Sequence, residues 1–157
     1  MQTQRRSVLK KLFASLVAVT GIGVAAKAKA NPVNPANEKE VFNVVTDDQD
    51  VPLFSGSTKY GGLVFIAGKG AHTEPFEIKA HTEIVLKELE KELIKAGSSM
   101  EKVLKVTVFL NDINDYKAMN EAYKGRFGSK PPVRTTVAVY GGVPGDSLVE
   151  MDCIAYI

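Results

Sequence analysis

One stretch decides the fold of this chain, and it reads Pro131-Pro132-Val133-Arg134-Thr135-Thr136-Val137-Ala138-Val139-Tyr140. From residue 133 onward its side chains are β-branched, small or aromatic, which is typical of a β-strand. By the two-residue alternation of a strand, Arg134 shares a small and partly polar face with Thr136. A guanidinium is always charged and is costly to bury without an anion. Arg134 therefore pairs with a carboxylate of its own chain or binds one on a small anionic ligand.

A second strand is predicted at residues 148–156, after a turn that is rich in glycine and proline. It carries two acids, Glu150 and Asp152, and the single cysteine of the chain, Cys153. One cysteine excludes an intrachain disulfide. Its apolar neighbours favour the interpretation of Cys153 as a small core residue rather than a reactive thiol.

The preceding residues predict further strands and two helices. Strands are expected at 41–45, between 53 and 60, at 63–67 and at 103–110. Residues 77–96 predict a helix that stops at Gly97, and a second helix begins at Asp112 or Asn114 and ends at Gly128. The charged residues expected on the solvated face of the first helix are Glu83, Lys87, Glu88, Glu90, Lys91, Glu92 and Lys95. Together these elements predict an α+β fold, a mixed sheet with both helices on one face.

The first thirty residues predict an export signal rather than part of the fold. Residues 4–10 (QRRSVLK) resemble a twin-arginine motif, and a short apolar stretch leads to Ala28-Lys29-Ala30, a small-x-small cleavage pattern. The apolar stretch is too short and glycine-rich for a good membrane span, although an uncleaved anchor is the alternative. We expect a signal at 1–30, cleaved near Ala30, a linker at 31–40 and one domain at 41–157, located in the periplasm.

Removal of this segment reverses the sign of the charge. The whole chain is +2, and residues 1–30 hold six basic residues and no acid, so the mature protein is 2 − 6 = −4. This balance argues against a nucleic-acid-binding surface. The two histidines, His72 and His81, lack the spacing of metal ligands, so no metal site is expected.

The order of these segments resembles that of the reactive-intermediate deaminase (RidA/YjgF) family over residues 50–157. The resemblance is carried by 53–55 (LFS), 61–68 (GGLVFIAG), 105–112 (KVTVFLND) with the helix behind it, 132–134 (PVR) and 149–151 (VEM). It implies a chorismate-mutase-like fold that hides the second face of its sheet in a homotrimer, with ligand sites between the subunits.

The resemblance also implies a reaction, the hydrolysis of a 2-imino acid or its enamine tautomer to a 2-keto acid and ammonia, without a cofactor. Arg134 matches the position that grips the substrate carboxylate with a two-pronged salt bridge, and Glu150 matches the acid beside the attacking water. The other positions that match the substrate-binding pocket are Phe54, Gly68, Asn120 and Thr136. No nucleophile or metal is required, which suits a chain that offers neither.

Structural roles are the alternatives for these residues. In this alternative interpretation, Arg134 forms an interface salt bridge with Glu150 or Asp152, and Glu150 serves only as the partner of Arg134. Asn120 then only caps or braces its helix. Phe54 is a wall or core residue, and Tyr116 and Tyr123 pack the second helix.

Two other functions compete with the deaminase. One is a non-catalytic trimeric binder of small carboxylates or of a partner protein, favoured by Ala67, where active family members often have serine, and by the export signal. Thr136 likewise stands where they often have cysteine, and Lys69 where glutamine is common. The other is an endoribonuclease, against which the negative mature charge and the two arginines beyond residue 30 argue.

Overall fold

The computed structural model describes residues 38–46 and 50–157. The chain divides into two units, Met1–Pro32 and Val33–Ile157, and every element below belongs to the second. The predicted export signal, its cleavage site and residues 31–37 of the predicted linker lie outside the described residues. Within the described ranges, no helix has the length and apolar character needed to cross a membrane.

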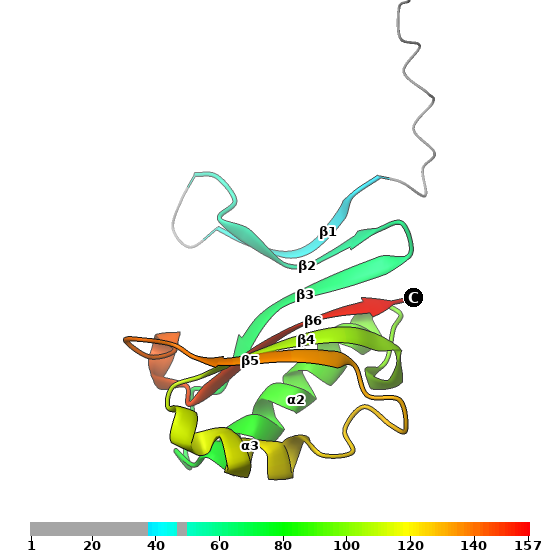
Figure 1. Ribbon diagram of the computed structural model, residues 1–157. Coiled ribbons are helices and arrows are strands. Elements are labelled where there is room, and N and C mark those ends of the chain that lie inside the picture. Colours follow the sequence, from blue (N-terminus) through cyan, green and yellow to red (C-terminus); the bar gives the residue numbers. More distant parts are fainter. Residues whose placement is uncertain (1–37, 47–49) are drawn as a thin grey trace, which may run out of the picture. The chain divides into compact units, whose positions relative to one another are not determined.

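Six strands form one mixed sheet in the order β1-β2-β3-β6-β4-β5 (Figure 1). The strands are β1 (Glu40–Val45), β2 (Phe54–Tyr60), β3 (Leu63–Gly70), β4 (Val103–Leu110), β5 (Val133–Ala138) and β6 (Val149–Tyr156). Neighbours are antiparallel except β4 and β5, which run parallel because helix α3 lies in the connection between them. The expected strands are therefore confirmed, and β3 continues three residues beyond its predicted end.

Two helices, α2 (Ile78–Lys95) and α3 (Tyr116–Tyr123), lie on one side of the sheet (Figure 1). This confirms the predicted α+β arrangement. Asp112 caps the short 3-10 turn η3 (Ile113–Asp115) before α3, and its carboxylate accepts the backbone N–H of Asn114. The predicted end of the second helix at Gly128 was wrong, because the backbone leaves helical geometry at Lys124 and Gly125 has a positive φ of 78°. Phe127, in the turns that follow α3, is nevertheless buried.

The core lies between the sheet and α2. Alternate residues of β3, β4 and β6, including Val64, Val106 and Met151, are fully buried, and α2 adds Leu86 and Leu89. Burial of such apolar area is the main favourable term in folding. Cys153 is part of this core, as predicted, and burial raises the pKa of its thiol to about 12.

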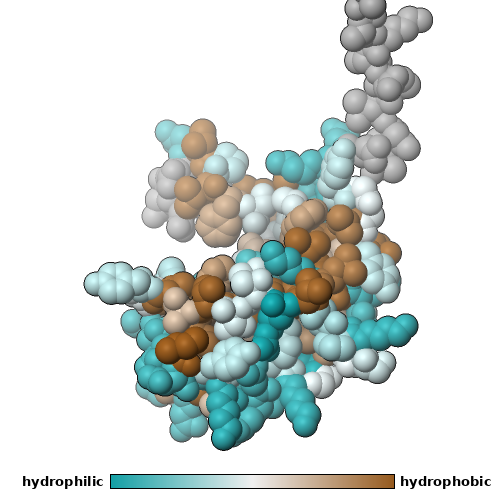
Figure 2. Space-filling view, in the orientation of Figure 1, coloured by the Kyte–Doolittle hydropathy of each residue, from teal (hydrophilic) through white to brown (hydrophobic). Residues whose placement is uncertain are grey.

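Within the described residues, no helix covers the opposite face of the sheet, and this face remains partly apolar. Large hydrophobic side chains are exposed on it, among them Phe65, Val137 and Tyr156 at about 40% of their full area. Figure 2 shows apolar surface exposed over the strands. We call this surface the open face.

Glu92 corrects one expectation from the sequence. It was predicted on the solvated face of the first helix, but it is 7% exposed. One carboxylate oxygen accepts a hydrogen bond from Nδ2 of Asn43 on β1 (2.8 Å) and the other is paired with Lys95 (2.8 Å). Hydrogen bonding to Lys95 is the main cause that lowers the pKa of Glu92, so the buried group stays ionised. Asn43 has a φ of 52°, a left-handed conformation that asparagine tolerates better than most residues.

Candidate functional site

Glu150 lies on the open face beside the bulge of β3. In β6 it alternates with the buried residues Val149 and Met151, and it pairs across with Phe109 of β4. A break in register between Ile66 and Lys69 brings Gly68 against its carboxyl group. A Cβ atom on Gly68 would overlap with Oε1 of Glu150. A side chain at position 68 would therefore displace the Glu150 carboxyl group from this position.

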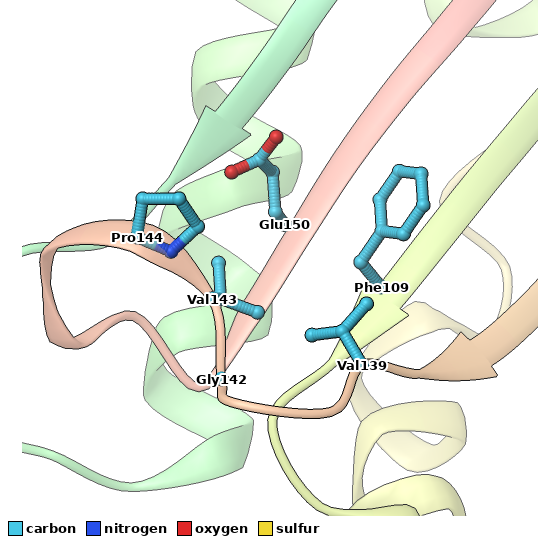
Figure 3. Close-up of a pocket in the computed structure, with 6 residues that line it drawn as sticks. All are labelled: Phe109, Val139, Gly142, Val143, Pro144 and Glu150. Carbon is cyan, nitrogen blue, oxygen red and sulfur yellow. The ribbon is translucent and has the colours of Figure 1, made fainter.

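A pocket of about 170 Å³ opens beside Glu150. Figure 3 shows the Glu150 carboxylate on one side and Phe109 and Val139 on the other, with the loop that follows β5 between them. The lining residues are Phe109, Val139, Gly142, Val143, Pro144 and Glu150. The pocket thus combines one carboxylate with mostly apolar walls, a composition that is common in sites for small organic ligands.

Buried hydrogen bonds fix the loop that forms this pocket wall. Ser147 accepts the backbone N–H of Ala71 with its hydroxyl oxygen (2.8 Å) and donates to the carbonyl of Val149 (2.7 Å). The fully buried His81 accepts the N–H of Leu148 at Nδ1 (3.2 Å) and donates from Nε2 to the carbonyl of Thr73 (3.0 Å). The loop is therefore held to the end of β3 and to the start of α2.

Both histidines have structural roles in this arrangement. Nδ1 of His72 donates to the carbonyl of Gly145 (2.7 Å), in the same loop. Within residues 38–46 and 50–157, no group of three or more histidines, cysteines or acids is placed to hold a metal ion.

Arg134 lies on the other face of the sheet, the face that carries the helices. Its partner in the parallel register is Val106, a fully buried core residue. The guanidinium lies over the rings of Tyr116 and Tyr123 of α3, with its carbon atom 5.7 and 4.6 Å from their centroids. Nη2 also donates to the Tyr116 hydroxyl (3.2 Å). In the part of the chain that the structure describes, Arg134 forms no salt bridge with a carboxylate.

These contacts change the interpretation of the two tyrosines. They were expected only to pack the second helix, but both rings lie within cation–π distance of the Arg134 guanidinium, an attractive arrangement. Burial raises the pKa of Tyr123 to about 12, although the charge of Arg134 works in the opposite direction. Tyr123 is therefore a neutral phenol at every physiological pH.

Thr136 shares the face of Arg134, as alternation predicted. It pairs with the buried Val108 of β4. Its hydroxyl oxygen is buried and has no hydrogen-bond partner among the described atoms, and the same is true of the Tyr123 hydroxyl. Asn120 lies half-buried on α3, where its carbonyl accepts the N–H of Lys124.

The predicted site residues thus fall into two groups in one chain. Gly68 and Glu150 lie on the open face, and we call them the Glu150 group. Arg134 and Thr136 lie on the opposite face, where α3 brings Tyr116 and Tyr123 against Arg134; we call these four residues the Arg134 group.

Phe54 belongs to neither group. It is half-exposed at the start of β2, where that strand pairs with β1 and not with β3, and it does not line the pocket beside Glu150. In Figure 1 this end of β2 runs apart from β3.

The sequence did not indicate the loop residues Val139, Val143 and Pro144 as pocket walls. The signal available was the Gly141-Gly142 and Pro144-Gly145 pattern, which was interpreted only as a turn. Gly142 has a φ of 91°, and a Cβ atom there would lie 2.7 Å from Oδ1 of Asn111. The glycine therefore lets the loop close on the end of β4.

Comparison with known proteins places these groups in a wider context. Residues 50–157 match the sequence profile of the family described as Endoribonuclease L-PSP. A RutC family protein of Pyrococcus abyssi is 36% identical over 124 residues, which cover 75% of this chain and 97% of the relative. Reactive Intermediate Deaminase A of Arabidopsis thaliana chloroplasts is 31% identical over 124 residues, 75% of this chain and 66% of the relative.

A solved structure of similar fold is E. coli TdcF with bound serine. It superposes with a TM-score of 0.62 at 26% identity, and the match covers 68% of this chain and 90% of TdcF.

Proposed function

This chain belongs to the endoribonuclease L-PSP family, also called RidA or YjgF, and we propose that it hydrolyses reactive 2-imino acids or their enamine tautomers to 2-keto acids and ammonia. The observation that carries this proposal is the environment of Arg134. Its guanidinium is oriented by two aromatic rings and one hydroxyl, and no carboxylate of the described chain neutralises it. Such a group is prepared to bind the carboxylate of a small ligand.

Hydrolysis of an imine requires few further groups from the protein. A protonated imine carbon is already electrophilic, so the site must hold the carboxylate and place a water molecule. The water oxygen bonds to the imine carbon as its proton passes to the Glu150 carboxylate. Glu150 then returns that proton to the nitrogen of the carbinolamine. The C–N bond breaks as the hydroxyl proton passes to the Glu150 carboxylate and the carbonyl forms, and the nitrogen leaves as ammonia. Asn120 and Thr136 line the substrate side in this proposal, and Gly68 lets the Glu150 carboxylate lie close against β3. Phe54, which lies outside the pocket of its own chain, is proposed as a wall of the shared site in the assembly.

The separation of the two groups supports a site built from two copies of the chain. Arg134 and Glu150 lie on opposite faces of one sheet, so one ligand reaches both only where two copies meet. The open face also exposes apolar side chains that association would bury. We therefore propose a homotrimer in which the Arg134 group of one copy faces the Glu150 group of the next.

Light scattering of the mature protein, starting near Asn31, tests this assembly. We expect a mass of three chains at micromolar concentration, because the open face is too apolar to remain in water. A stable monomer at that concentration would contradict both the proposed trimer and the proposed site between two copies.

A second candidate function is carboxylate binding without turnover. Ala67, which precedes Gly68 at the bulge, offers no hydroxyl to a ligand beside Glu150. The serine bound to TdcF shows that a protein of this fold binds an amino acid. Imino acids generated freshly by an amino-acid oxidase separate the two functions: the deaminase shortens the lifetime of the imine, and the binder leaves it unchanged.

We propose further that the protein is exported to the periplasm by the twin-arginine route. Arg5 and Arg6 precede the apolar stretch that leads to Ala30, and replacement of both by lysine keeps the charge but removes the paired guanidinium groups. We expect the Arg5→Lys/Arg6→Lys precursor to remain in the cytoplasm. Cell fractionation and blotting measure this, and unchanged periplasmic accumulation would contradict the route.

A further inference from the structure

Tyr116 differs from an ordinary packing residue in its exposure and in its partner. Its side chain is 43% exposed, yet its hydroxyl oxygen is engaged by Nη2 of Arg134 at 3.2 Å. A surface tyrosine usually leaves its hydroxyl to water. Here the hydroxyl belongs to an exposed side chain and lies within hydrogen-bond distance of the Arg134 guanidinium.

The hydrogen-bonding capacity of this hydroxyl is only half used. A phenol accepts with its oxygen and donates one proton. Because the guanidinium has only donors, Tyr116 must accept from Arg134, and its own proton remains available. The same contact polarises the phenol, because acceptance from a cation makes an O–H group a stronger donor.

We propose that Tyr116 is a further ligand-binding residue, whose hydroxyl donates to the carboxylate that Arg134 holds. This inference rests on the proposed role of Arg134. A carboxylate has two oxygens with about four acceptor positions, so it accepts two N–H groups of the guanidinium and the phenol proton together. The ligand class is a small 2-keto or 2-imino acid, whose planar carboxylate satisfies all three donors.

Tyr123, the other tyrosine beside Arg134, lacks the features that suit Tyr116 for binding a carboxylate. Its ring lies closer to the Arg134 guanidinium, 4.6 Å from the centroid, but its hydroxyl is buried and has no hydrogen-bond partner in the described structure. This hydroxyl is less accessible from solvent than that of Tyr116. Of the two tyrosines that contact Arg134, Tyr116 alone combines an exposed side chain with a bonded hydroxyl.

Calorimetric titration of the mature protein with 2-oxobutanoate tests this inference. Tyr116→Phe keeps the ring over Arg134 and removes only the hydroxyl, so we expect the Kd to rise about 10- to 100-fold, as for one hydrogen bond to a charged group. The melting temperature should stay within about 1 °C, because the side chain is partly exposed. The matched control is Tyr60→Phe, which removes the hydroxyl of another exposed tyrosine, at the end of β2, and should leave the Kd unchanged.

Arg134→Ala in the same titration separates the two proposals. If Arg134→Ala abolishes binding and Tyr116→Phe binds as tightly as the wild type, the role of Tyr116 is overturned and that of Arg134 stands. If Arg134→Ala binds normally, the carboxylate site itself fails, and the inference fails with it. An equal loss in Tyr116→Phe and Tyr60→Phe would also overturn it, because the effect would then not depend on contact with Arg134.

Discussion

Arg134→Ala should abolish measurable imine hydrolysis while the protein stays folded and associated. Each charge-assisted hydrogen bond to the substrate carboxylate contributes on the order of 1.5–3 kcal/mol, so kcat/KM should fall at least about tenfold for each bond lost. Arg134→Lys should also be poor, because an ammonium keeps the charge and loses the planar fork. Turnover of a freshly generated imino acid, measured beside oligomer size, gives the result.

The matched control for this variant is Arg126→Ala. Arg126 is the other arginine beyond residue 30, and it lies in the turn that follows α3. The same truncation there should leave turnover near the wild-type value. If Arg134→Ala instead breaks the oligomer apart, a structural interface salt bridge explains the arginine better than substrate binding does. Full turnover in an intact Arg134→Ala oligomer would eliminate the proposed role.

Glu150→Gln should separate the chemical step from binding. The amide occupies nearly the same volume beside Gly68 but cannot take a proton from water, so kcat should fall about 100-fold or more, the scale of general base catalysis. Binding of 2-oxobutanoate should change little, because Arg134 still holds the carboxylate. Steady-state kinetics and calorimetric titration measure the two effects separately.

Asp152→Asn is the matched control for that substitution. Asp152 lies two residues along β6 on the same face as Glu150, pairs with Thr107, and lines no part of the pocket beside Glu150. The Asp152→Asn variant should therefore hydrolyse the imino acid at about the wild-type rate. Equal losses in the two variants would indicate that the charge of the open face matters rather than a particular carboxylate. An active Glu150→Gln would exclude Glu150 as the base.

Local patterns in the sequence predicted most of the fold. The strand at 103–110 has the bounds that β4 has in the structure, because a run of β-branched and apolar residues defines it without competition. The alternation in 133–140 placed Arg134 and Thr136 together on one face, as the register with Val106 and Val108 confirms. Such periodicity depends only on neighbours along the chain.

The sequence did not predict the features that depend on distant segments. The buried Glu92 accepts a hydrogen bond from Asn43, 49 residues away, and no local pattern predicts that contact. The aromatic environment of Arg134 depends on the distance at which α3 lies from β5, which no spacing in the sequence specifies. Alternation within each C-terminal strand was predicted correctly. The positions of Arg134 and Glu150 relative to each other were not predicted, because β4 lies between their two strands in the sheet.

A crystal structure of the mature protein soaked with 2-oxobutanoate tests most directly whether Arg134 binds substrate in a shared site. We expect the carboxylate on the guanidinium of Arg134 in one copy, with the Tyr116 hydroxyl beside it. The keto carbon should face Glu150 of a neighbouring copy. A keto acid bound away from Arg134, or an Arg134 already paired with Glu150 or Asp152 of the neighbouring copy, would contradict this function.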